Sequence, residues 1–155
     1  MLFRSPQRFD AVARLLEQHG LRYQRRSANA PIANDIQVLL GDSMGEMYAY
    51  YACCDAAFIG GSLLPFGGQN LIEACVLGKP VLIGEHTFNF SEAADEAVKA
   101  GAALRVTDAA DLARKASALL THPELVQRMS EASARFARDR TGATQRLLDG
   151  LPSVE

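Results

Sequence analysis

The chain has 155 residues, 48% of them hydrophobic and 22% charged, which is the composition of one folded domain with a hydrophobic core and argues against disorder. Its formal charge of −2, from 16 basic and 18 acidic residues, argues against a nucleic-acid partner. The cysteines Cys53, Cys54 and Cys75 lack metal-ligand spacing, and no apolar run approaches the roughly 20 residues of a membrane span, so we expect a soluble chain in a reducing compartment.

Segments with strand and helix patterns alternate along the chain. The predicted strands are residues 21–26, 36–40, 56–59, 81–83 and 103–106. The first predicted helix begins at Ser5-Pro6 and ends at Gly20. Four more are predicted over residues 44–51, 70–77, 91–100 and 108–120. Two further helices follow the break at His122-Pro123, and the second of them begins after Gly142.

This alternation predicts an α/β fold, in which a parallel sheet of about five or six strands is covered by helices on both faces. We expect a single Rossmann-like domain over residues 1–155. Ligands of such sheets bind beyond the carboxyl ends of the strands, so the loops that follow the strands are the candidate site.

The most informative loop follows the strand at residues 56–59. It contains Gly60-Gly61 and Gly67-Gly68, and a helix begins directly after it. Glycine lets the backbone approach a ligand, the helix start offers N–H groups to a phosphate, and Glu73 one turn later can accept ribose hydroxyls. Asn70 with Glu73 also nearly matches a helix capping box, which needs no ligand, so both interpretations stay open.

Two further loops are candidates. In residues 41–46, Ser43 and Glu46 match a capping box, and Gly45 in a first helical turn costs about 1 kcal/mol relative to Ala, which points to a close backbone approach. After the strand at residues 81–83, His86 and Asn89 are candidate pocket residues, with two nearby phenylalanines. No Walker loop, GxGxxG or HExxH pattern is present, and a complete active site is not evident.

These blocks together resemble the 3-deoxy-D-manno-octulosonic acid (Kdo) transferases, in order and spacing, over nearly the whole chain. The matching blocks are Gly41-Asp42-Ser43-Met44-Gly45-Glu46, Phe58-Ile59-Gly60-Gly61-Ser62, Gly67-Gly68-Gln69-Asn70-Leu71-Ile72-Glu73-Ala74, Gly78-Lys79-Pro80-Val81-Leu82 and His86-Thr87-Phe88-Asn89-Phe90.

The resemblance implies the C-terminal half of a GT-B glycosyltransferase, which binds CMP-Kdo. The parent enzyme transfers Kdo to lipid A precursor in lipopolysaccharide inner-core biosynthesis, releases CMP, and needs no metal or cofactor. It works at the cytoplasmic side of the bacterial inner membrane. The catalytic base and the membrane-associating surface belong to an N-terminal domain that this chain lacks, so we expect no catalytic residue here and no activity from this chain alone.

The resemblance also implies roles for individual residues. The donor-binding residues would be Arg4 at the phosphate, Met44, Gly45 and Glu46 at the cytidine, Gly61 and Ser62 at the sugar, and Asn70, Leu71, Ile72 and Glu73 at the phosphate and ribose. Gly68 and Gln69 would also belong to the donor site. The chain departs from the family pattern at Phe3-Arg4-Ser5, where the family reads Pro-Arg-His, and at Gln69, where the family often has His. Two alternatives remain: a GT-B enzyme that uses a UDP-sugar, and a non-catalytic nucleotide-sugar-binding module.

Overall fold

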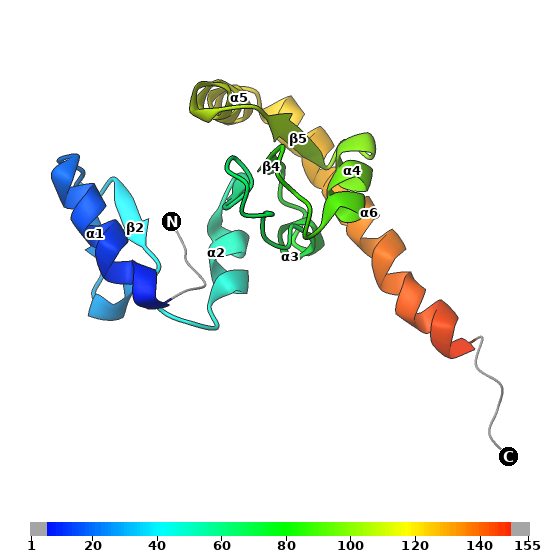
Figure 1. Ribbon diagram of the computed structural model, residues 1–155, viewed down its shortest axis with the longest axis horizontal. Coiled ribbons are helices and arrows are strands. Elements are labelled where there is room, and N and C mark those ends of the chain that lie inside the picture. The colour runs from blue at the N-terminus through cyan, green and yellow to red at the C-terminus, as the bar shows by residue number, and fades with distance from the viewer. Residues whose placement is uncertain (1–5, 150–155) are drawn as a thin grey trace, which may run out of the picture. The chain divides into compact units, whose positions relative to one another are not determined.

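The protein was analysed as a computed structural model that describes residues 6–149, with side chains for residues 7–140, so Arg4 lies outside the described residues. By its contacts the chain separates into two compact units, Met1–Tyr50 and Tyr51–Glu155, and each is described by itself. Helix α2 (Met47–Cys53) crosses the division between them (Figure 1). The single domain over residues 1–155 stays a prediction.

The first unit is a helix packed on a two-stranded parallel sheet. Tyr23 in β1 pairs with Val38 in β2, and Arg25 pairs with Leu40. Apolar residues spaced along α1 meet Leu40 and form a small core. The elements are a 3-10 helix at Pro6–Arg8, α1 at Phe9–Gln18, β1 at Tyr23–Arg25, a second 3-10 helix at Arg26–Ala28, and β2 at Val38–Leu40.

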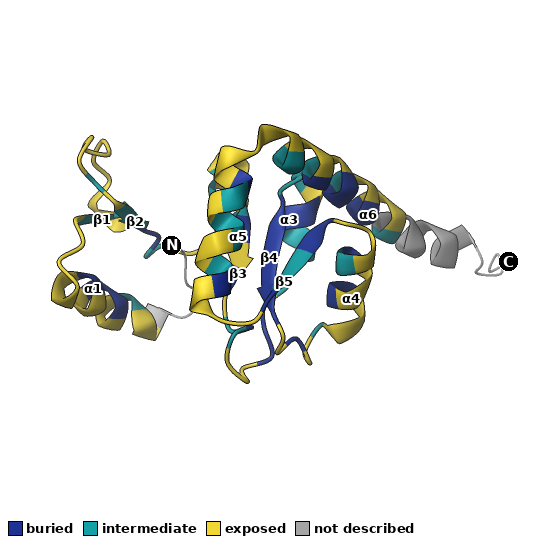
Figure 2. Ribbon diagram, turned by 90° about the horizontal axis from the view of Figure 1, so that it is seen from above, coloured by how far each residue is buried: buried dark blue, intermediate teal, exposed yellow. Residues whose placement is uncertain are grey.

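The second unit holds a three-stranded parallel sheet in the order β3-β4-β5. Figure 2 shows β4 and β5 between α5 on one side and α4 and α6 on the other. The elements are β3 at Ala57–Ile59, α3 at Ile72–Val76, β4 at Val81–Gly84, α4 at Ser91–Lys99, β5 at Ala103–Val106, α5 at Ala109–Thr121 and α6 at Pro123–Asp149.

Alternating side chains of β4 explain why helices cover both faces of this sheet. Successive residues of a strand point to opposite faces. Val81 and Ile83 join the core formed with α3, α4 and α6, whereas Leu82 joins a second cluster with α5. All four residues of β4 are buried, as expected for the central strand of a covered parallel sheet. The predicted parallel α/β architecture with helices on both faces is therefore confirmed.

Two predictions about the elements were wrong. The five strands of the described residues form two sheets rather than one, because β1 pairs with β2 while β3, β4 and β5 pair among themselves. In addition, α6 runs unbroken through Gly142, where a new helix was expected. A glycine inside a helix costs only about 1 kcal/mol relative to Ala, which does not by itself end the helix. The break at His122-Pro123 is confirmed, because α5 ends before it and Pro123 is the first residue of α6.

Candidate functional site

The second unit carries two adjacent loops at the carboxyl ends of neighbouring strands. The first loop, residues 60–71, leaves β3 and leads into α3, and the second loop, residues 85–90, leaves β4 and leads into α4. Since β3 and β4 are parallel and paired, both loops emerge at the same edge of the sheet, which is where ligands bind in folds of this class.

Ser62 ties the bases of the two loops together. Its Oγ donates to the carbonyl oxygen of Ile59 at 2.5 Å and accepts a hydrogen bond from the N–H of Gly84 at 2.8 Å. The backbone N–H of His86 donates to the Ser62 carbonyl at 2.9 Å. Ser62 is fully buried, and the contact with the donor sugar that the resemblance implied stays a prediction. Its visible role is to hold the two loops.

Gly84 is required by this junction, and the sequence analysis missed it. A Cβ at Gly84 would lie 2.1 Å from the Ser62 carbonyl oxygen and 2.6 Å from the backbone nitrogen of Leu63. Both atoms belong to backbone, so neither can move aside cheaply. The available signal was a glycine directly after the buried apolar run of residues 81–83.

The tips of the loops also meet. The Gly68 N–H donates to the Gly61 carbonyl at 2.9 Å, which closes the first loop on itself, and the Asn89 N–H donates to the Gly67 carbonyl at 3.3 Å. The three glycines have φ between +71° and +86°, a conformation that favours glycine. The side chain of His86 is exposed at this edge.

The start of α3 leaves backbone groups available. Asn70 Oδ1 accepts a hydrogen bond from the Ile72 N–H at 2.9 Å, but the N-cap of α3 is Leu71 and the helix has no side-chain cap, so the prediction that Asn70 caps the helix was wrong. The N–H groups of Gln69 and Asn70 have no acceptor in the described part of the chain. Leu71 is fully buried, while Ile72 and Glu73 are half-buried. Gln69 is exposed and Asn70 is half-buried, so their N–H groups are the candidate donors at this edge, and Leu71 anchors them to the core.

Arg105 of β5 holds the second loop by hydrogen bonds, and the sequence analysis did not identify this residue. Its Nη1 donates to the Gly84 carbonyl at 2.7 Å and to Thr87 Oγ1 at 3.0 Å, and its Nη2 pairs with Asp95 Oδ1 at 2.5 Å. These contacts link β5, the second loop and α4. An arginine within an otherwise apolar strand was the signal available in the sequence.

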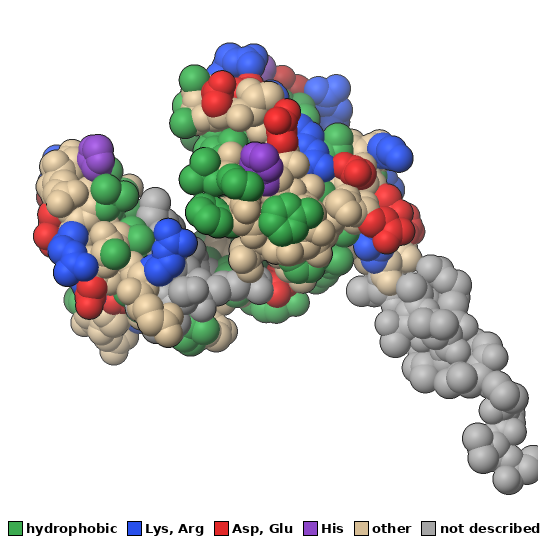
Figure 3. All heavy atoms as spheres, in the orientation of Figure 1, with side chains coloured by type: hydrophobic (Ala, Val, Ile, Leu, Met, Phe, Trp, Pro, Cys, Tyr) green, Lys and Arg blue, Asp and Glu red, His purple; other side chains and the backbone are tan. Residues whose placement is uncertain are grey.

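Exposed apolar side chains surround this edge of the second unit. The exposed large residues of the two loops are Leu64, Phe66 and Phe88, and Figure 3 shows apolar side chains gathered on one face of the unit. No helix among residues 6–149 is both long and apolar enough to cross a bilayer. Over those residues, too, no group of three His, Cys, Asp or Glu side chains lies together as a metal ion would require.

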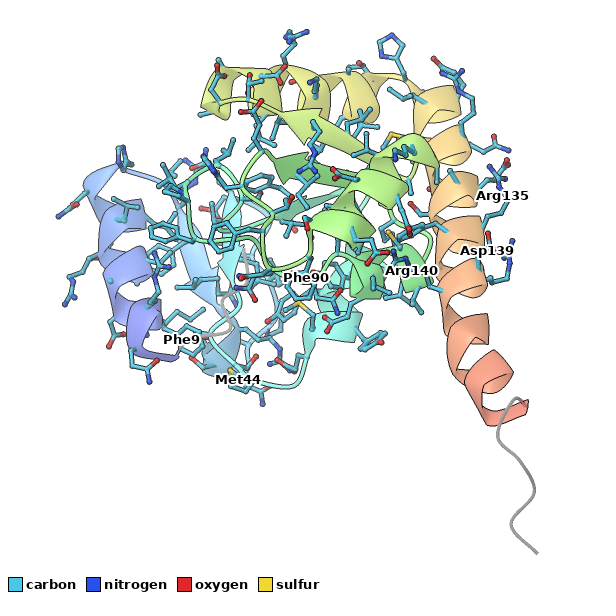
Figure 4. All side chains as sticks on the ribbon, turned by 45° about the vertical axis from the view of Figure 1, so that its right-hand side comes forward. Phe9, Met44, Phe90, Arg135, Asp139 and Arg140 are labelled. Carbon is cyan, nitrogen blue, oxygen red and sulfur yellow. The ribbon has the colours of Figure 1, made fainter. Side chains whose placement is uncertain are left out.

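The third candidate loop belongs to the first unit and follows β2. Met44 lies on it with 60% of its surface exposed (Figure 4). Helix α2 begins at Met47, so the predicted capping box is wrong: Ser43 Oγ donates to the Glu46 carboxylate and does not cap the helix by accepting a helix N–H. Gly45 has φ +82°, and a Cβ added to it would meet no atom within 4 Å. Its backbone conformation, which favours glycine, explains the residue at this position.

An ion pair and several hydrogen bonds hold this loop in place. Arg26 Nη2 donates to Glu46 at 2.8 Å, and the hydrogen bond from Ser43, together with Arg26, holds the pKa of Glu46 below its ordinary value. Asp42 accepts hydrogen bonds from the Ser27 N–H at 2.8 Å and from its Oγ at 2.6 Å. Burial acts to raise the pKa of Asp42, but the bonds from Ser27 outweigh it and leave the pKa lowered.

A family model described as "Glycosyl transferases group 1" matches residues 17–136. This range includes all three candidate loops, and the chain belongs to this family of glycosyltransferases.

The relatives narrow the family further and confirm the resemblance to Kdo transferases. The chain is 52% identical over 149 residues to a 3-deoxy-D-manno-octulosonic acid transferase of Bordetella pertussis, and this match covers 96% of the chain and 35% of the relative. It is 42% identical to the Haemophilus influenzae protein of the same name, again over 96% of the chain and 35% of the relative. The chain thus spans about a third of the length of these relatives.

A solved structure supports the same placement. The crystal structure of the C-terminal CMP-Kdo binding domain of WaaA from Acinetobacter baumannii is similar to this chain, with a TM-score of 0.82 and 36% identity. The match covers 86% of this chain and 69% of that domain. The fold is therefore that of the C-terminal domain of a GT-B enzyme.

Proposed function

We propose that this chain is the donor-binding part of a Kdo transferase and that it binds CMP-Kdo. The single observation that carries the proposal is the match to a CMP-Kdo binding domain over 86% of the chain. The name of that domain supports CMP-Kdo over a UDP-sugar as the donor. The names of the relatives support an enzyme over a non-catalytic binding module.

The second unit offers a place for the donor phosphate. The N–H groups of Gln69 and Asn70 lie without an acceptor among the described residues and follow the glycine turn at the edge of the sheet. Such N–H groups are the usual donors to a phosphate, and they act without a metal ion. Glu73, in the first turn of α3, is proposed to accept the ribose hydroxyls. Gly61 and His86 lie at the same edge of the sheet.

Met44, Gly45 and Glu46 remain the proposed contacts of cytidine. Within their own unit, Arg26 and Ser43 hold the Glu46 carboxylate in place. The Glu46 carboxylate is ionised at neutral pH, because its pKa is lowered, and it can accept a hydrogen bond from the cytosine amino group. Arg4 remains a predicted phosphate contact.

The remaining parts of the proposal concern the whole enzyme. We propose that the enzyme transfers Kdo to lipid A precursor in lipopolysaccharide biosynthesis, without a metal or cofactor, at the cytoplasmic side of the inner membrane. The catalytic carboxylate and the acceptor site would lie in the part of the enzyme to which this chain has no counterpart. General-base assistance is worth about 10²–10⁴-fold in rate, so the chain alone is expected to be inactive.

A chimera tests this function directly. This chain would replace the matching 149 residues of the Bordetella pertussis relative, and CMP release and mass of the lipid product would be measured with CMP-Kdo and lipid A precursor. We expect transfer of Kdo that persists in EDTA. A folded chimera that releases no CMP, or that uses a UDP-sugar instead, would contradict the proposal, and loss of activity in EDTA alone would contradict its metal independence.

A further inference from the structure

One side chain, Asn89, joins the tip of the second loop to the glycine turn of the first. Its Nδ2 donates to the carbonyl oxygen of Phe66 at 3.4 Å and of Gly68 at 3.5 Å. Its backbone N–H donates to the Gly67 carbonyl at 3.3 Å. Asn89 therefore contacts three consecutive residues of the turn that leads directly into Gln69.

The turn is shaped to admit this side chain. A Cβ on Gly67 would lie 2.4 Å from Asn89 Nδ2 and 2.6 Å from Cε2 of Phe88, and Gly67 has φ +86°. A larger residue at Gly67 would push Asn89 away and would also be strained. The glycine and the asparagine are thus parts of one arrangement.

The two ends of the loop pair are held with different strength. At the base, the bonds of Ser62 are buried and measure 2.5–2.9 Å. At the tip, the bonds of Asn89 measure 3.3–3.5 Å, and Asn89 itself is exposed. Longer, solvated bonds open at lower cost, so the tip is the part of the pair whose geometry a single side chain can control.

The chemistry of the amide group separates Asn89 from the ligand-binding groups. Its Nδ2 is directed at loop carbonyls, which leaves Oδ1, an acceptor only, and an acceptor does not bind the oxygens of a phosphate. Asn89 is therefore suited to act on the donor through the turn and not by direct contact.

We propose that Asn89 is a positioning residue. By holding the turn Gly67-Gly68, it sets the direction of the N–H groups of Gln69 and Asn70 that follow. The inference rests on the proposed function, since those two groups are the proposed phosphate donors.

The first test needs no ligand. Amide hydrogen exchange would be measured by NMR in the wild-type chain, in Asn89→Ala, and in Asn34→Ala, a matched control at an exposed asparagine of the first unit. The loss of a hydrogen bond corresponds to about three- to tenfold in an opening equilibrium, so the Gly68 N–H should exchange faster by that factor in Asn89→Ala only. Equal Gly68 exchange in the two variants would overturn the proposal. So would a wild-type Gly68 N–H that exchanges as fast as that of Gln69.

The second test measures CMP affinity of the same three proteins, with melting temperature as a check on folding. Asn89→Ala should raise the Kd for CMP about three- to tenfold and shift the Gln69 and Asn70 amide signals of the free protein, with an unchanged melting temperature. If wild type binds CMP and Asn89→Ala binds it equally well, the role of Asn89 is refuted and the proposed function stands. If wild type does not bind CMP, the proposed function fails as well, while the exchange rates still show whether Asn89 holds the turn.

Discussion

Replacing Ser62 with Ala should destabilise the second unit far more than a serine substitution usually does. The side chain is fully buried, and its hydroxyl donates to the Ile59 carbonyl and accepts from the Gly84 N–H. Alanine fills nearly the same space, so the change removes two hydrogen bonds without adding strain.

The expected loss follows from the two bonds. The buried N–H of Gly84 is left without its acceptor, which costs about 1–3 kcal/mol, and the bond to Ile59 contributes about 0.5–1.5 kcal/mol. We therefore expect the free energy of unfolding to fall by about 2–4 kcal/mol, a large part of the roughly 5–15 kcal/mol that stabilises a typical domain.

Urea denaturation measured by circular dichroism would determine this loss. Ser117→Ala is the matched control, because Ser117 is exposed on α5, and surface substitutions usually change stability by no more than about 0.5 kcal/mol. A Ser62→Ala variant as stable as this control would refute the structural role of the hydroxyl.

Three further outcomes are expected. Glu73→Gln should keep the melting temperature but raise the Kd for CMP about tenfold or more, because a hydrogen bond to a charged group contributes about 1.5–3 kcal/mol; an unchanged Kd with lower stability would favour a purely structural role. Burial raises the pKa of the Cys75 thiol to about 11, so iodoacetamide at pH 8 should modify the exposed Cys53 well before Cys75, as followed by mass spectrometry. The hydrogen bond from Lys115 lowers the pKa of Asp111 from its ordinary 3.8. Ionised Asp111 therefore contributes its full stabilisation above the ordinary pKa, and this contribution is lost as the pH falls through the lower pKa of Asp111 in the folded protein. Asp111→Asn should accordingly be less stable than wild type at pH 7, and the difference, measured by urea denaturation, should shrink on acidification; a pH-independent difference would contradict this.

Local sequence signals predicted the elements well. The cap at Asp108 is confirmed, since its Oδ1 accepts from the Asp111 N–H at 2.7 Å, and the continuous apolar run at residues 81–83 is the buried centre of a parallel sheet. Both features depend only on a few residues that are neighbours in the sequence, so they can be predicted from it.

Pairing between distant segments was harder to predict. Nothing in residues 36–40 or 56–59 indicates that β2 and β3 belong to different sheets, because any two short apolar strands have compatible patterns. The same reason explains the miss at Gly84, whose requirement arises from Ser62, 22 residues away along the chain.

The family resemblance located the candidate loops. It could not separate residues that support a loop from those on its surface, since both recur in the same motif. The structure makes this distinction: Ser62 and Leu71 are fully buried, whereas Gln69, His86 and Asn89 are exposed.

The most direct test of the central claim is a titration of this chain with CMP, followed by amide NMR and repeated with UMP. We expect saturable binding of CMP, with weaker binding of UMP, and shifts concentrated at Gly45, Gly61, Gly68 and Asn70. Absence of binding, equal binding of UMP, or shifts that leave these loops unaffected would contradict the assignment of this chain as a CMP-Kdo-binding domain.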